Sequence, residues 1–215
     1  FQRQRHQFYQ IFLLELARDM DRNDAVVGQT IERAVINAIQ DGIPLDVQTP
    51  DEGLNRELAQ RWAGWANEAD ACDATGEMTF ADMEGLIYRH VLVDGDILAL
   101  PLRDGRLQLI EGHRLKTPTN TTRNVVLGVL MDERRRRLEY WLAKDEISPL
   151  AAVTRVADIT AYPARDSQGE RQVLHIYNPR RVSQTRGVTA LAPIFDMLAL
   201  FEDINFAKLV QQQVV

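Results

Sequence analysis

The sequence is poor in cysteine, with Cys72 as its single thiol among 215 residues. One thiol cannot form an internal disulfide, so we expect a protein of a reducing compartment. No apolar run reaches the roughly 18 residues that a membrane-spanning helix needs. The first ten residues also lack the apolar stretch of a signal peptide. We therefore expect no membrane partner.

The chain begins with Phe1 instead of Met, and its last apolar pattern has no stop signal before Val215. We expect that the native start is missing and that the native chain continues beyond this end. The hydrophobic fraction is 45% and the charged fraction is 26%, both ordinary for a folded globular protein. The length suits one or two domains with a real core.

Basic side chains are outnumbered, with 25 Lys and Arg against 31 Asp and Glu and a formal net charge of −6. An acidic chain repels the phosphate backbone at long range, which predicts a poor general nucleic-acid binder. The same charge is compatible with a surface past which DNA slides without being held.

Common catalytic motifs are absent from the sequence: there is no Gly-x-Ser-x-Gly elbow, no phosphate-binding loop and no dinucleotide fingerprint. The four histidines stand in no zinc-ligand spacing; they are His6, His90, His113 and His175. Glu111, His113 and Arg114 form one cluster that proton transfer could use. The alternative for this cluster is an ordinary loop after a strand. We predict no catalytic, cofactor-binding or metal-binding residue.

Apolar periodicity predicts helices over residues 7–19 and 23–40, with Gly42 and Pro44 ending the second. A short strand is predicted at 45–48, and a third helix is predicted to open at Thr49. This helix carries Trp62 and Trp65 on one side, a spacing typical of core or subunit contacts. Residues 79–82 have a capping-box pattern, which predicts a fourth helix that ends at 94–95.

The second half of the chain predicts strands. Two alternating runs, 96–103 and 106–111, are joined by Asp-Gly, a strong hairpin signal. A second hairpin is predicted with strands 125–131 and 138–142, and its turn holds Arg134, Arg135, Arg136 and Arg137. For these arginines a solvated tip, a partner interface and a DNA contact all stay open. A strand at 171–177 and a last helix from Thr189 complete an α+β fold.

The segment before the last helix carries a resemblance to a known family. Val173-Leu-His-Ile-Tyr-Asn-Pro-Arg-Arg181, then Gln184-Thr-Arg-Gly-Val188 and Leu191-Ala-Pro193, resemble the signature of lambda-family phage portal proteins. The signature residues are His175, Tyr177, Gln184, Thr185, Arg186 and Gly187. Upstream pieces, such as Asp94-Gly-Asp96 and Arg114-Leu-x-Thr-Pro118, are similar to the family in the same order. The resemblance covers residues from about 15 to 212, although four arginines stand where the family often has a turn glycine.

The resemblance implies a ring, usually of twelve subunits, at one capsid vertex of the virion, assembled in the host cytoplasm. It implies docking of the terminase large subunit, capsid, scaffold and head-completion proteins, with double-stranded DNA passing without sequence specificity. It also implies that the chain is not an enzyme and has no cofactor. The portal arrangement of wing, stem and clip divides the chain into a wing-like helical region with the first hairpin (1–111), a clip-like β-rich region (112–182) and the start of a stem or wing helix (183–215).

Candidate subunit interfaces are Trp62, Trp65 and the arginines Arg134, Arg135, Arg136 and Arg137, because aromatic residues and arginine are enriched at interfaces. Two alternative functions stay open at this point. One is another phage head-assembly or connector protein. The other is a metal-dependent hydrolase or nuclease.

Overall fold

The structure, a computed structural model, describes residues 2–144 and 148–213. The chain opens with two helices, α1 (Gln2–Asn23) and α2 (Ala25–Ile39). Asp24 separates them and caps α2, because its carboxylate accepts the amide hydrogens of Val26 and Val27 at 2.8 and 2.9 Å. Both helices were predicted, and α1 continues four residues beyond the predicted end at 19. Of the helices in the described residues, none is both long and apolar enough to cross a membrane.

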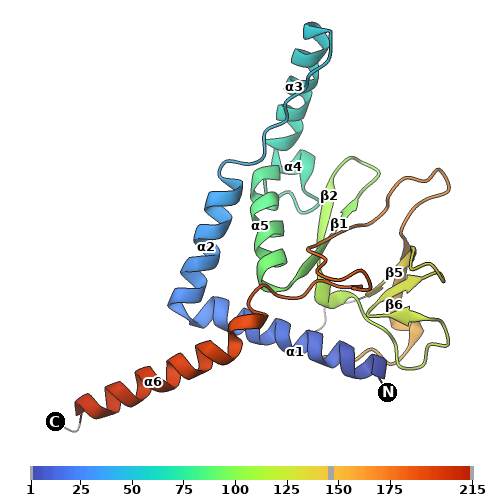
Figure 1. Ribbon diagram of the computed structural model, residues 1–215. Coiled ribbons are helices and arrows are strands. Elements are labelled where there is room, and N and C mark those ends of the chain that lie inside the picture. The colour runs from blue at the N-terminus through green and yellow to red at the C-terminus, as the bar shows by residue number, and fades with distance from the viewer. Residues whose placement is uncertain (1, 145–147, 214–215) are drawn as a thin grey trace.

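Residues 43–66 form an arm that stands out from the body (Figure 1). Its first part, residues 43–51, is irregular and runs outward to the tip, so the predicted strand at 45–48 is wrong. Helix α3 (Glu52–Ala66) returns to the body, and its N-cap is Asp51 instead of the predicted Thr49. Asp51 is two residues nearer the helix and its carboxylate accepts two helical N–H groups, which Thr49 does not reach.

The base of the arm is held by aromatic packing. The rings of Trp62 and Trp65 lie 5.2 and 5.1 Å from that of Phe80, and 5.1 Å from each other. The Trp65 indole donates to the carbonyl of Gly105 at 3.1 Å. Both tryptophans are half-buried, so they fasten the arm to its own subunit.

A short helix, α4 (Ala69–Cys72), precedes α5 (Phe80–Val93). The predicted capping box is confirmed: the Thr79 side chain and the Asp82 side chain each bind the other's backbone. Helix α5 packs against α2 and α1 and leads into β1 across Asp94 and Gly95. Their shared core contains Ala17, Val27, Ile31 and Val93.

The first sheet has three antiparallel strands in the order β2-β1-β7. Strands β1 (Asp96–Pro101) and β2 (Leu107–Glu111) form the predicted hairpin. The other neighbour of β1 is β7 (Leu174–Tyr177), so a strand from the predicted clip-like region 112–182 lies in the sheet of the first hairpin. Residues 97–100 of β1 are all buried, as expected for the central strand.

The second sheet has four antiparallel strands in the order β3-β4-β5-β6. They are β3 (Val125–Val126), β4 (Val129–Met131), β5 (Arg137–Ala143) and β6 (Ile159–Pro163). The predicted single strand 125–131 is therefore wrong, because Leu127 and Gly128 adopt φ angles of 53° and 80° and turn the chain. Side chains from both sheets share one core, including Leu98, Ile110, Leu115, Val129 and Leu142.

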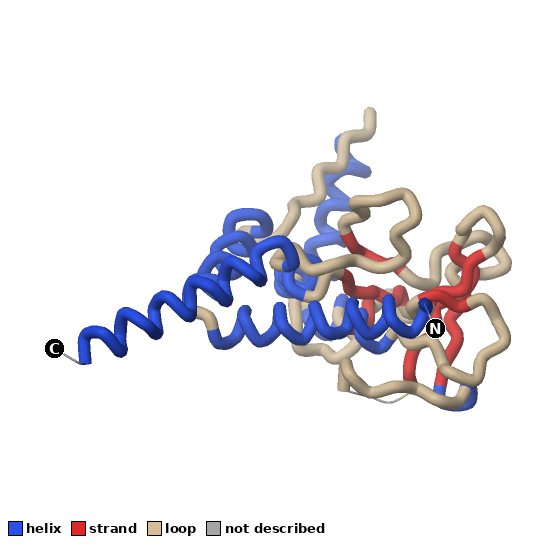
Figure 2. The backbone as a smooth tube through the Cα atoms, turned by 60° about the horizontal axis from the view of Figure 1, so that its bottom comes forward, coloured by secondary structure: helices blue, strands red, loops and turns tan. Residues whose placement is uncertain are grey.

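Three one-turn helices, η1 (Gly112–Arg114), η2 (Val156–Asp158) and η3 (Ala192–Ile194), connect these elements. The last helix, α6 (Phe195–Gln213), begins after η3 and not at Thr189 as predicted. Thr189 instead donates its hydroxyl to the carbonyl of Leu92 at 3.2 Å. Leu191 and Phe195 are buried among the first helices, and α6 then leaves the body (Figures 1 and 2). The fold is α+β, as predicted.

Candidate functional site

Asp96 is a fully buried carboxylate at the point where α5 passes into β1. Its oxygens accept hydrogen bonds from both Nε and Nη2 of Arg186, the latter at 2.8 Å. The backbone N–H of Gly187 donates at 3.0 Å, and His175 Nε2 lies 3.0 Å away. Four donors therefore surround one carboxylate, and they come from β7 and from the segment that leads to α6.

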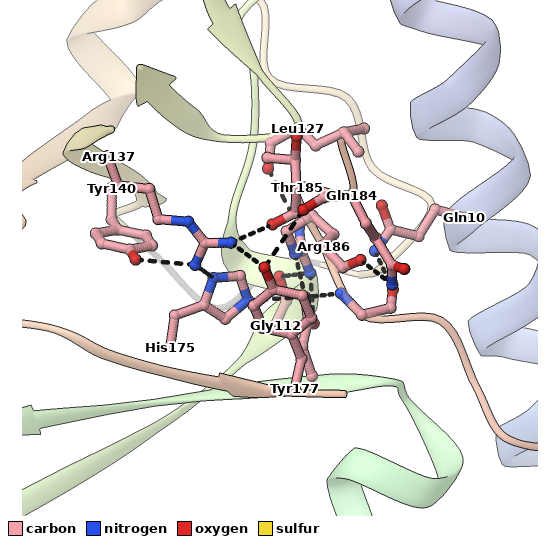
Figure 3. Close-up of polar contacts among 12 residues, drawn as sticks. Gln10, Gly112, Leu127, Arg137, Tyr140, His175, Tyr177, Gln184, Thr185 and Arg186 are labelled. Atoms are coloured by element: carbon pink, nitrogen blue, oxygen red, sulfur yellow. Dashed lines mark hydrogen bonds and ion pairs between the residues drawn. The ribbon is translucent and has the colours of Figure 1, made fainter. Parts of the chain in front are cut away.

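Arg186 links the two sheets through the same guanidinium group (Figure 3). Its Nη2 also donates to the carbonyl of Gly112 at 2.6 Å, and its Nη1 donates to that of Leu127 at 3.3 Å. Gly112 follows β2 in the first sheet, and Leu127 lies between β3 and β4 in the second. One side chain thus ties the segment before α6 to both sheets.

His175 connects Asp96 to Arg137 through its two ring nitrogens. Arg137 Nη1 lies 2.8 Å from His175 Nδ1, and an arginine can only donate. The imidazole therefore accepts at Nδ1 and carries its hydrogen on Nε2, facing Asp96. Burial lowers the pKa of His175, Asp96 opposes this, and the charges of Arg186 and Arg137 lower it further, so the ring is neutral.

Arg137 closes the outer side of the network. It donates to the Tyr177 hydroxyl, to the carbonyl of Thr185 at 3.0 Å and to the Tyr140 hydroxyl at 3.2 Å. Its guanidinium carbon also lies 4.9 Å from the centre of the Tyr177 ring, a cation–π distance. Arg137 is the first residue of β5, so the network contacts the second sheet at two places, at Leu127 and at Arg137.

The Asp96 carboxylate is stabilised as an anion by its direct contacts. Burial alone raises the pKa of Asp96, but the charge of Arg186 and the hydrogen bonds from Arg186 and His175 hold it well below its usual range. The carboxylate is therefore ionised inside the protein. We call the group formed by Asp96, Arg137, His175, Tyr177 and Arg186 the Asp96 junction.

Two glycines make room for the junction. A Cβ at Gly112 would lie 2.0 Å from Asp96 Oδ1, and one at Gly187 would lie 1.8 Å from the carbonyl oxygen of Gly95. Both distances are impossible for a side chain, so each glycine is required by close approach.

Asp94 is a second buried carboxylate, and it binds a different helix. Arg18 of α1 donates to it from Nε and Nη2 at 2.8 and 2.6 Å, and His90 Nδ1 lies 2.6 Å away. Burial raises the pKa of Asp94, but hydrogen bonds from Arg18 and His90 lower it overall. The sequence Asp94-Gly95-Asp96 thus fastens α1 on one side and the segment before α6 on the other.

The chain matches one family model, described as phage portal protein, lambda family, over residues 9–215. This chain belongs to the lambda family of phage portal proteins. No curated protein matches it. Portal proteins are structural components of the virion head, act in capsid assembly and connect head to tail.

The geometry explains what the signature of this portal protein does inside the fold. His175, Tyr177, Thr185, Arg186 and Gly187 all contact the Asp96 junction or form part of it. The sixth signature residue, Gln184, braces the same segment, because its Nε2 donates to the carbonyl of Arg186 at 2.8 Å. The signature is therefore a structural clamp around a buried charge.

The roles of two residues in this network were not predicted from the sequence. Asp96 was predicted only as the start of a strand, and nothing in the spacing signals that its partner lies 90 residues later. Gln10 of α1 donates to the carbonyl of Gly187 at 2.9 Å, which joins α1 to the signature. The Asp-Gly-Asp pattern in front of a buried strand was the available signal, because such a carboxylate requires a partner.

The predicted interface residues lie in different surroundings. Trp62 and Trp65 pack at the base of the arm, as described above. Arg134, Arg135 and Arg136 are exposed in the β4–β5 turn, and Arg135 also donates to the carbonyl of Ser183 at 2.6 Å. Arg137 belongs to the junction and not to the tip.

The cluster of Glu111, His113 and Arg114 borders a cavity of about 510 Å³, together with His90. Glu111 lies 2.8 Å from His113 Nδ1 and accepts from Arg18 at 3.0 Å. The bond from His113 and the charge of Arg18, opposed by burial, lower the pKa of Glu111 to about 2. Arg114 points elsewhere and donates to the carbonyl of Ala143 at 2.7 Å. Within the described ranges, no three His, Cys, Asp or Glu side chains form a metal-binding group.

Proposed function

We propose that this portal protein forms a ring of twelve copies at one capsid vertex, through which DNA is packaged and ejected. The observation that carries the proposal is the family match over residues 9–215. The fold supports it, because the signature residues fasten helices and sheets to one another around a buried charge. A ring wall needs such internal rigidity.

We assign residues 1–111 to a wing, 112–182 to a clip and 183–215 to the start of a stem or wing helix. The direction in which α6 leaves the body supports the last assignment (Figure 2). Its start is fixed by buried Leu191 and Phe195, whereas Met197, Leu200 and Ile204 beyond them are exposed. These apolar side chains suit contacts in an assembly.

The ring's further partners in this proposal are the terminase large subunit, capsid and scaffold proteins and head-completion proteins. Double-stranded DNA passes through without sequence specificity. The net charge of −6 supports this passage, because many Lys–phosphate and Arg–phosphate contacts would hold the duplex. The subunit is made in the host cytoplasm and ends in the virion.

We further propose that the subunit has no enzymatic activity of its own. The fully buried carboxylate of Asp96 accepts four hydrogen bonds and is closed to a substrate. Glu111 faces a cavity but is held as an anion by His113 and Arg18, which leaves it a weak proton acceptor.

Electron microscopy of the full-length protein tests the ring. We expect annular particles of uniform symmetry, with twelve copies by mass measurement. Particles that remain single globules at assembly concentrations contradict the proposal.

A companion assay tests the alternative function of a metal-dependent hydrolase. The protein is incubated with Mg²⁺ and either linear DNA or ATP, and the Glu111→Gln variant serves as the comparison. We expect no turnover by either protein. Cleavage that disappears in Glu111→Gln would replace the portal role with an enzymatic one.

A further inference from the structure

Arginines line a cavity of about 620 Å³ beside β5 and the loop before β7. Five of its nine lining residues are arginines, and none is acidic: Arg135, Arg136, Arg137, Arg165 and Arg171, with Tyr140, Ala164, Gly169 and Val173. We call it the arginine pocket. So many guanidinium groups around one hollow favour an anionic occupant.

Within residues 2–144 and 148–213, the carboxylates of neighbouring Asp132 and Asp166 form no ion pair with the pocket's arginines. Asp132 accepts the backbone N–H groups of Arg134 and Arg136 at 2.9 and 2.7 Å and so closes the β4–β5 turn. Asp166 does the same in its own loop, accepting from the N–H groups of residues 168 and 170. Across residues 2–144 and 148–213, no ion pair involves Arg136 or Arg171.

The opposite charge gathers in another part of the chain. The arm, residues 43–66, contains four Asp and Glu against two Arg. All four acids and one of the arginines lie between residues 46 and 58, which gives that stretch a formal net charge of −3. Its outer part, from Asp46 to Leu58, exposes Glu52 together with Leu54 and Leu58.

The arm and the pocket occupy separate places on the molecule. The arm projects beyond the body, whereas the pocket lies against the body at β5, and both views show α3 apart from the four-stranded sheet (Figures 1 and 2). An arm that extends from one copy and a hollow on the body of another give two unlike patches. Two unlike patches on each subunit are what a head-to-tail ring requires.

We infer that the acidic arm of one subunit docks into the arginine pocket of the next subunit around the ring. This inference rests on the proposed ring and names its charged contact. A second copy fits better than DNA, because the chain itself supplies the complementary charge. The pocket also has the volume of a few side chains, whereas a duplex needs an open groove.

Charge reversal in the full-length protein tests the contact. One variant carries Arg136→Glu and Arg171→Glu in the pocket, and a second carries Asp46→Lys and Glu52→Lys in the arm. All four side chains are exposed, so the fold should persist, which circular dichroism verifies. Arg33→Glu on α2 is the matched control, an exposed arginine that forms no ion pair in the described residues.

Ring assembly is followed by sedimentation velocity over a range of protein and salt concentrations. We expect each double reversal to raise the concentration needed for half-assembly at least about tenfold, because like charges then face each other. The four substitutions combined should restore most of the assembly. The control should match the wild type, whose assembly should weaken as salt increases.

The outcomes separate the two proposals. If the wild type forms rings and both reversals assemble equally well, the contact inferred here is wrong and the portal ring stands. If the wild type forms no ring, the proposed function fails and the contact fails with it. If the pocket variant assembles normally but loses binding to a 20-base-pair duplex in fluorescence anisotropy, the pocket holds DNA and the inference is overturned.

Discussion

The Asp96 junction makes its strongest prediction for the substitution Asp96→Asn. The amide keeps the shape of the carboxylate but removes its charge. Arg186 then remains buried, and its positive charge has lost the negative charge with which it was paired. The amide's NH₂ group also replaces one of the two carboxylate oxygens, and in either orientation an N–H donor of Arg186 loses its acceptor.

The magnitude follows from this geometry. Removing one partner of a buried ion pair lowers the free energy of unfolding by about 3–5 kcal/mol. For a chain of this size each kcal/mol shifts the melting temperature by about 2–4 °C, so Asp96→Asn should lower it by roughly 6–20 °C. This is a large part of the total stability of about 5–15 kcal/mol that a domain commonly has.

The assay is urea unfolding, followed by tryptophan fluorescence and circular dichroism. Asp104→Asn is the matched control, because Asp104 also accepts two hydrogen bonds from an arginine, Arg106, but on the exposed hairpin turn. Exposed pairs contribute little to stability because solvent screens them, so the control should unfold near the wild-type midpoint. Equal midpoints for Asp96→Asn and Asp104→Asn would refute the structural reasoning.

A double-variant cycle sharpens the same prediction. Arg186→Met leaves Asp96 as the unpaired charge and should also be strongly destabilising. The combined variant removes both charges, so it should be clearly more stable than the sum of the two single losses predicts. Strict additivity would mean that the two side chains act independently, contrary to their contacts.

Three other predictions concern single positions. Gly112→Ala should be strongly destabilising in urea unfolding because its Cβ meets Asp96 at 2.0 Å, whereas Gly64→Ala on open α3 should stabilise by about 0.5–1 kcal/mol; similar effects at both sites would contradict this. Burial and the charge of Arg186 lower the pKa of Lys116 to about 8 from 10.5, so stability should rise with pH between these values, and Lys116→Met should remove the rise in a pH series of unfolding curves. Thr79→Ala should lower the midpoint of thermal unfolding through a loss of about 0.5–2 kcal/mol in the α5 cap, and an unchanged midpoint would argue against the capping box.

Local patterns in the sequence predicted most elements because they depend on neighbouring residues. The capping box at Thr79 and the Asp-Gly hairpin at 104–105 involve contacts over three or four residues, and both are confirmed. The predictions failed where distant packing decides the backbone. Gly128 turns the chain between β3 and β4 with a φ angle of 80°, and a Cβ there would lie 2.7 Å from Leu115, a close approach that the run of apolar residues at 125–131 does not reveal.

The candidate site was only half predictable for the same reason. The signature residues were identified as a group through the family resemblance, but their common target was not. Asp96 and Arg186 lie 90 positions apart, and a single sequence carries no record of such a pairing. The tryptophans could be placed on one side of α3, yet the partner Phe80 comes from another helix.

A buried charge pair adds little net stability over well-packed apolar side chains, so the Asp96 junction needs another physical reason. The junction contributes by fixing a single orientation of the segment that it binds. A leucine in place of Arg186 could pack in several ways, whereas a carboxylate with fixed donors accepts one arrangement of residues 186–187. Two residues before Asp96 in the chain, Asp94 imposes the same restriction on α1, because it binds Arg18. The first helix, both sheets and the entry to α6 are thereby held at defined angles to one another, and the proposed ring, in which one interface repeats around a closed circle, requires such angles.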